Sequence, residues 1–208
     1  MTHEEFLELL QLTHEVSGVE FKPPGNLKSD KVLRFTVARA VMGMANRRDG
    51  GRVVLGVREV AGKLELIGLT ASELNSWRYD LVADALAPLS DPPAVFETEV
   101  HEHEGRQYVV LLVNEFEDVP IICRRNSPRV FSKNEPPILQ EGMVYVRTRR
   151  KPETTAIPSQ TEMRELLELA TEKRLRQVMG TVSRAGAVLR SSAPAEEAFD
   201  AELGDEFQ

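Results

Sequence analysis

Cysteine and tryptophan are almost absent from this chain of 208 residues, which has one of each, Cys123 and Trp77. A single cysteine excludes an intramolecular disulfide and a zinc site built from several cysteines, and it is typical of a reducing cytoplasm. Long apolar runs are also absent, and none approaches the roughly 18 residues that a membrane-spanning helix needs. We therefore expect a cytoplasmic protein without a membrane partner.

Positive charge is missing from the end of the chain. Positions 191–208 contain six acids and no lysine or arginine, so they carry −6 of the net charge of −7. The acids are Glu196, Glu197, Asp200, Glu202, Asp205 and Glu206. The absence of an apolar pattern able to form a core predicts a disordered tail. Phe199, Leu203 and Phe207 lie among these acids and leave a second interpretation open, in which the tail docks onto a protein partner.

Basic residues gather in two segments of the remaining chain. Residues 22–58 contain nine bases and two acids, a net charge of +7, and residues 120–151 contain eight bases and two acids, a net charge of +6. Clustered bases can form a phosphate-binding face on a chain that is acidic overall. The alternative is that these bases pair with acids elsewhere in the chain.

The order of the expected elements predicts an α/β (α+β) fold, with a mixed β-sheet flanked by helices. Apolar spacing and turn residues predict helices at 4–14, 30–46, 70–87 and 160–180. Strands are expected at 19–22, 53–57, 64–69, 95–101, 107–113, 120–123 and 143–147. Because the first two strands flank the second helix, we expect them to be parallel. The expected boundaries are 1–158 for the main domain, 159–190 for a C-terminal helical extension and 191–208 for the acidic tail.

Two glutamates lie five residues apart across an expected break between helix and strand. Glu15 and Glu20 can converge there, and a third acid would complete a site for Mg²⁺ or Mn²⁺ that activates water against a phosphodiester. Lys22 follows closely and would stabilise the charge that develops on phosphate. The alternative is a chance pairing, because the chain contains 33 acids.

A pair of glycines separates the second helix from the buried strand. Gly50 and Gly51 allow backbone to approach a ligand closely, although a plain tight turn is the better interpretation of this pair taken alone. The segment is not a P-loop, because its glycines follow the helix and no Gly-Lys-Ser/Thr is present. Asn46 is placed to hold the turn through its side-chain amide.

Several short motifs together resemble the Schlafen-AlbA domain family over about residues 10–157. They are Glu15, Val19-Glu20-Phe21-Lys22, Ala45-Asn46 with Gly50-Gly51, Leu55-Gly56-Val57, Ile67-Gly68-Leu69, Tyr145-Val146-Arg147 and Thr154-Thr155-Ala156. The resemblance implies an α/β domain that binds nucleic acid, RNA more than DNA. In Schlafen nucleases, two such lobes clasp structured RNA and three acids form a metal-dependent endoribonuclease site. A chain with one lobe would therefore act as a homodimer.

The resemblance assigns roles to particular residues. Glu15 and Glu20 match the first two family acids, and Arg58 stands where the third is usual, so Glu59 is the remaining candidate. Since neighbouring strand residues face opposite sides, Glu59 is expected to point away from the other two. The predicted catalytic set is Glu15, Glu20, Glu59 and Lys22, with Mg²⁺ or Mn²⁺ on the three glutamates. The predicted nucleic-acid contacts are Arg47, Arg48, Arg52, Arg147, Arg149, Arg150 and Lys151.

Three functional hypotheses follow. The first is a Schlafen-like endoribonuclease acting on structured RNA such as tRNA. The second, favoured by Arg58, is a non-catalytic module that binds DNA or RNA, as a regulator or a component of a defence assembly. The third is an adaptor that binds a protein partner through the acidic tail, which could also cover the basic face of its own chain.

Overall fold

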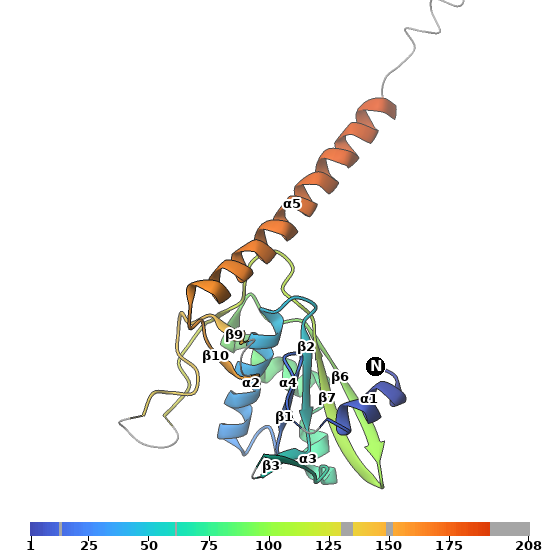
Figure 1. Ribbon diagram of the computed structural model, residues 1–208, viewed down its shortest axis with the longest axis vertical. Coiled ribbons are helices and arrows are strands. Elements are labelled where there is room, and N and C mark those ends of the chain that lie inside the picture. Colours follow the sequence, from blue (N-terminus) through green and yellow to red (C-terminus); the bar gives the residue numbers. More distant parts are fainter. Residues whose placement is uncertain (13, 61, 130–134, 149–151, 192–208) are drawn as a thin grey trace, which may run out of the picture. The chain divides into compact units, whose positions relative to one another are not determined.

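The computed structural model describes residues 1–12, 14–60, 62–129, 135–148 and 152–191, with side chains up to residue 185. It has the expected α/β class, with a mixed sheet and helices (Figure 1). The chain divides into two compact units, Met1–Leu169 and Ala170–Gln208. The first unit thus extends past the expected boundary at residue 158, and the expected tail lies, apart from Ser191, outside the described residues.

The main sheet has four strands in the order β1-β2-β7-β6. Their bounds are Val19–Lys22 for β1, Gly51–Leu55 for β2, Arg106–Val113 for β7 and Phe96–His103 for β6. The strands β1 and β2 are parallel, as expected, and the other neighbours are antiparallel. The connection between β1 and β2 is α2 (Lys31–Ala45), which begins where the Asp30 carboxylate accepts a hydrogen bond from the Leu33 amide at 2.9 Å.

Two helices cover opposite faces of this sheet (Figure 1). The helix α1 (His3–Leu10) buries Phe6 and Leu10 against a cluster that includes Val19 and Phe21 of β1. Because side chains alternate along a strand, Glu20 of β1 faces the other way, toward α2. The charged residues of β1 therefore lie on the face covered by α2.

Glycine at position 56 changes the course of the expected strand 53–57. Gly56 has φ +101°, and a Cβ there would lie 3.0 Å from the Tyr108 ring, so the position requires glycine. The strand β2 ends at Leu55, and β3 (Val57–Val60) leaves the sheet to form a separate hairpin with β4 (Lys63–Leu66). The expected strand 64–69 is thus shorter and belongs to this hairpin.

The expected helix 70–87 is divided at a buried tryptophan. The capping box of Thr70 and Glu73 opens α3 (Ala71–Ser76), and α4 (Tyr79–Leu86) and the short η1 (Ala87–Leu89) follow. Trp77 lies between α3 and α4, is 1% exposed, and donates a hydrogen bond to the Gly25 carbonyl at 2.8 Å.

Two further small sheets complete the first unit. They pair β5 (Ser90–Asp91) with β8 (Ile122–Cys123), and β9 (Tyr145–Arg147) with β10 (Thr154–Ala156). The last helix, α5 (Gln160–Ser191), is longer than the expected 160–180, and α1 is shorter than the expected 4–14. Among the described residues, no helix has the length and hydrophobicity needed to cross a membrane.

Candidate functional site

The structure brings Glu15 and Glu20 together on one guanidinium group, that of Arg147 in β9. Nη1 of Arg147 donates to Glu20 Oε2 at 2.8 Å, and Nη2 donates to Glu15 Oε2 at 2.9 Å. Nη2 also donates to the Val19 carbonyl at 2.7 Å. The Arg147 side chain is only 1% exposed, so this is a buried ion-pair cluster.

Two more side chains complete the set of contacts to Glu20. Thr154 Oγ1 donates to Glu20 Oε2 at 2.6 Å, and Lys22 Nζ forms an ion pair with Glu20 Oε1. Two carboxylates therefore face two cationic groups, and the cluster is electrically neutral. Burial opposes the ionisation of Glu20, but Lys22 and Arg147 outweigh it and hold the pKa of this carboxyl below its usual value.

The members of the cluster come from four segments: the connection before β1, and the strands β1, β9 and β10. Glu15 lies in the connection before β1, and its Oε1 accepts a hydrogen bond from the Phe21 amide at 2.8 Å, which fixes the connection to the strand. Thr154 on β10 approaches α2 at Gly43, where a Cβ would lie 2.5 Å from Thr154 Cγ2. A larger residue at 43 would displace the hydroxyl that donates to Glu20.

Asn46, at the end of α2, holds this region in place. Its Nδ2 donates to the carbonyls of Ile121 at 2.8 Å and Tyr145 at 3.0 Å, and its Oδ1 accepts from the Ile121 amide at 2.7 Å. The side chain is buried. These hydrogen bonds of the Asn46 side chain thus join α2 to β9 and to the segment before β8, rather than to the Gly50-Gly51 turn.

Glu59, the third predicted metal ligand, is placed apart from the cluster. It is exposed on β3, in the hairpin that leaves the main sheet at Gly56. In the part of the chain that the structure describes, no three His, Cys, Asp or Glu side chains form a group that could hold a metal ion. With Arg147 and Lys22 on the other two glutamates, these residues do not fit a Mg²⁺ or Mn²⁺ site.

The predicted phosphate contacts fall in different environments. Arg147 is buried, as described above, and cannot reach a phosphate without breaking its ion pairs. Arg48 is exposed, whereas Arg47 and Arg52 are half-buried. Nη1 of Arg47 donates to the carbonyls of Arg48 at 2.9 Å and Gly50 at 2.8 Å, so this side chain closes the turn after α2. The remaining predicted contacts, Arg149, Arg150 and Lys151, lie outside the described residues.

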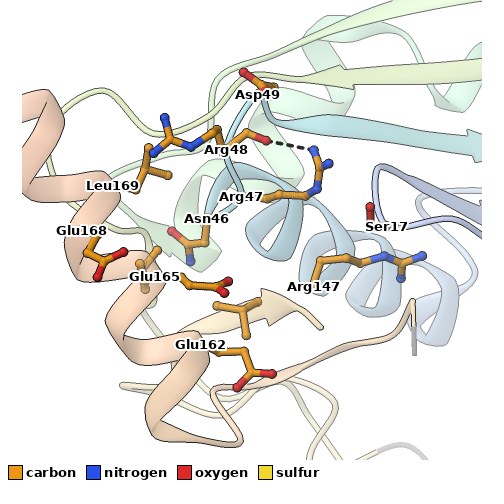
Figure 2. Close-up of a pocket in the computed structure, with 12 residues that line it drawn as sticks. Ser17, Asn46, Arg47, Arg48, Asp49, Arg147, Glu162, Glu165, Glu168 and Leu169 are labelled. Carbon is orange, nitrogen blue, oxygen red and sulfur yellow. Dashed lines mark hydrogen bonds between the residues drawn. The ribbon is translucent and has the colours of Figure 1, made fainter. Parts of the chain in front are cut away.

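A pocket of about 320 Å³ opens beside the cluster, with Arg147 in its wall. Arg47 and Arg48 line one side, and three glutamates at the start of α5 line another (Figure 2). They are Glu162, Glu165 and Glu168. Acidic and basic side chains thus line the same pocket, so the pocket is not a uniformly cationic site for phosphate.

Sequence reasoning missed two functional features of this region. Thr154 was part of a recognised motif, but its hydroxyl had no assigned role, and the glutamates at the start of α5 had none either. The signal for Thr154 was the unusual position of Gly43 within a helix, where glycine often marks close approach of another segment. Cys123 is 1% exposed, and burial raises the pKa of its thiol, in keeping with a core residue.

No protein-family model and no curated protein matches the sequence. The DIP2311 protein of Corynebacterium diphtheriae has a similar fold, with 14% identity and a TM-score of 0.46 over 68% of this chain, which spans only 22% of that protein. The N-terminal domain of a RecG-related protein from Nitrosomonas europaea is similar over 65% of this chain and 92% of that domain, with 20% identity and a TM-score of 0.43. Both are distant likenesses of fold alone.

Proposed function

We propose that the chain is a nucleic-acid-binding module whose carboxylate pair is structural rather than catalytic. The structural role of the carboxylates is supported by the burial of Arg147 between Glu15 and Glu20. A metal ion bridging these carboxylates would have to displace the guanidinium. Arg147 would then lose its carboxylate partners in a buried position, which is strongly unfavourable.

The nucleic-acid part of the proposal is supported by the bases that the cluster does not use. Arg147 and Lys22 neutralise the buried glutamates, but other bases of the two basic segments are exposed. The described and exposed ones are Lys28, Lys31, Arg48, Arg58, Arg124, Arg125 and Arg129. Exposed arginines and lysines neutralise phosphates and release their counterions, which provides affinity without requiring a catalytic centre. The family resemblance favours RNA over DNA as the ligand.

The endoribonuclease remains the competing function. It would need Mg²⁺ or Mn²⁺ and a third carboxylate close to Glu15 and Glu20, a role that exposed Glu59 does not fill. Cleavage of a structured RNA such as tRNA would thus require both the cluster and the hairpin to rearrange.

Binding is tested by fluorescence anisotropy of the full chain with labelled tRNA and with a DNA duplex, over a range of salt concentrations. We expect the affinity to fall steeply with salt. Arg124→Glu with Arg125→Glu should weaken binding at least tenfold and reduce the salt dependence, because each phosphate contact contributes roughly 0.7 to 0.9 to the logarithmic slope.

The matched control carries the same change of charge at exposed bases outside the two basic segments. Lys63→Glu with Arg78→Glu should weaken binding clearly less than the paired change at 124 and 125. Equal losses would indicate only a general charge effect, and no binding by the wild type would reject the proposal. Metal-dependent cleavage of the tRNA that Glu20→Gln abolishes would instead establish the endoribonuclease.

A further inference from the structure

The strand β6 forms one edge of the main sheet (Figure 1). Among the described residues it pairs with β7 alone, so its other side carries no strand of this part of the chain. The strand contains no proline, and Glu97, Val100 and Glu102 along it are exposed. An open edge of this kind presents backbone groups on which a further strand can form.

The turn after β6 fixes which of its backbone groups point outward. Two residues with positive φ separate His103 from Arg106, which identifies a tight hairpin in which these two residues exchange backbone hydrogen bonds. Because bonded and non-bonded pairs alternate, the odd-numbered residues of β6 bond to β7. At the other end of the strand, the Val95 carbonyl accepts from the Asn114 amide at 3.0 Å, in the same alternation. The residues whose amides and carbonyls face the open edge are therefore Phe96, Thr98, Val100 and Glu102.

The two faces of β6 differ in chemistry. The odd-numbered side chains, which include Glu97 and Glu99, lie on the same side of the sheet as α1. The even-numbered side chains lie on the other side, where Val100 is 55% exposed. Tyr79 of α4 is 58% exposed on that side, and its ring centroid lies 5.7 Å from that of Phe96. One face of the edge is thus acidic, and the other offers exposed apolar surface.

The charge of this edge restricts what can pair with it. Residues 96–105 contain four glutamates and no lysine or arginine. A second copy of β6 would bring two acidic strands together, and residues 192–208 carry six acids as well. Like charges on neighbouring strands are destabilising, whereas opposite charges attract. A basic strand is therefore the occupant that the charge favours.

We infer that β6 binds an extended, basic segment of a partner protein, which adds a further strand to the main sheet. Basic and apolar side chains alternate in the segment that fits, with the basic ones beside Glu97 and Glu99 and the apolar ones beside Val100. Backbone hydrogen bonds provide affinity in this mode of binding, and the alternating side chains provide specificity. This interaction goes beyond nucleic-acid binding and depends on different residues, so either can fail without the other.

The probe is a peptide with blocked ends and the sequence Thr-Lys-Val-Lys-Val-Lys-Thr, which matches the length of residues 96–102. Isothermal titration calorimetry measures its affinity for the full chain. One control peptide has the same composition with its lysines grouped at one end, and another carries N-methyl groups on both valines, which removes backbone donors but no charge. Both controls should bind at least about tenfold more weakly. Equal binding by the grouped peptide would show attraction by charge alone and would overturn the inference.

A change at position 100 tests the edge from the side of the protein. Val100→Pro removes an outward amide, and the bonds from its neighbours to β7 remain, because proline is tolerated on an edge strand where its nitrogen faces outward. This variant should bind the probe at least about tenfold more weakly, whereas the matched Val100→Thr, which keeps the amide, should stay within about twofold. Thermal denaturation and the fluorescence of buried Trp77 verify that both variants are folded.

Hydrogen exchange of the unmodified chain, followed by NMR, tests the same geometry without a mutation. The amides of Thr98, Val100 and Glu102 should exchange quickly in the free chain and those of Glu99 and His101 slowly. The probe should slow the first three. A probe that does not bind, or that binds without protecting these amides, would contradict the inference. Protection in the chain alone that rises with protein concentration, together with a dimer in ultracentrifugation, would show that a second copy occupies the edge instead.

Discussion

The Arg147 side chain joins β9 and β10 to a segment near the start of the sequence. It holds Glu15 in the connection before β1 and Glu20 within β1, and it lies next to Thr154 on the paired strand β10. Glu20 and Thr154 also contact each other, and Glu15 is tied to β1 through the Phe21 amide, so the cluster acts as a unit. Because the cluster is buried, disrupting it should lower the free energy of unfolding rather than change the properties of the surface.

We predict that Arg147→Met lowers the free energy of unfolding by about 3–5 kcal/mol, because it leaves Glu20 buried with Lys22 as its remaining cationic partner. Urea denaturation followed by circular dichroism measures this change. In the wild type, the contribution of ionised Glu20 is complete above pH 4.5, the ordinary value for this carboxyl, and is lost as the pH falls through its lower folded pKa.

The double variant Arg147→Met with Glu20→Gln provides the control for this prediction. Removing the buried Glu20 charge, which has lost its Arg147 partner, should recover part of the stability, giving a coupling energy of at least about 1 kcal/mol between the two positions. The cycle also needs the single variant Glu20→Gln. If the losses of stability in Arg147→Met and Glu20→Gln add up to the loss in the double variant, the two residues do not depend on each other, and the structural role assigned to the cluster is wrong.

At the residue scale, the sequence indicated half of this cluster. The spacing of Glu15 and Glu20 predicted that their carboxylates converge, because they lie only five positions apart across a break between helix and strand. Arg147 is 127 residues from Glu20, and its basic neighbours made it look like a phosphate contact. Local sequence records charge but not burial, and tertiary packing places this one arginine in the interior.

At the element scale, the turn between α2 and β2 depends on Gly50. This residue has φ +63°, and a Cβ there would lie 2.0 Å from the Val113 carbonyl oxygen. Gly62, in the β3–β4 hairpin, has a similar φ of +76° but nothing within 4 Å of the Cβ position. A side chain at position 62 would therefore cause backbone strain alone, whereas one at position 50 would cause both backbone strain and steric overlap.

We predict that Gly62→Ala costs about 1–2 kcal/mol from backbone strain alone, whereas Gly50→Ala costs at least about 2 kcal/mol more because the turn must also move. Thermal and urea denaturation of the two variants measures the difference. Equal costs would mean that the turn after α2 adjusts freely, so that Gly50 is needed only for its φ angle.

Local patterns predicted where most elements lie, but not where tertiary contacts divide them. The helix at 30–46 and the strands at 95–101 and 107–113 follow from patterns of nearby residues, and the structure confirms them to within a few residues. The run 53–57 reads as one strand, but packing of Gly56 against Tyr108 and Gly68 ends it. That division carries Glu59 into the separate hairpin, which the sequence alone did not show.

At the scale of the whole molecule, charge is arranged in separate regions rather than spread evenly. The buried cluster is neutral, exposed bases lie on the first unit, α5 has an acidic and a basic half, and positions 191–208 carry six acids. The tail is thus the largest block of charge opposite in sign to the bases that we propose contact nucleic acid. Its acids can compete with phosphate for them, provided that screening by salt is weak.

We predict that removing residues 191–208 tightens tRNA binding several-fold at an ionic strength of about 0.05 M, and that the gain disappears near 0.5 M because the Debye length then falls to a few ångströms. Anisotropy titrations of both proteins at the two salt concentrations measure this. A tail of unchanged length, with its six acids replaced by Asn and Gln, should bind as tightly as the truncated chain if charge is the cause. If the amide tail behaves like the wild type while truncation tightens binding, the tail acts by occupying space. If neither change alters affinity, the tail does not cover the basic surface of its own chain.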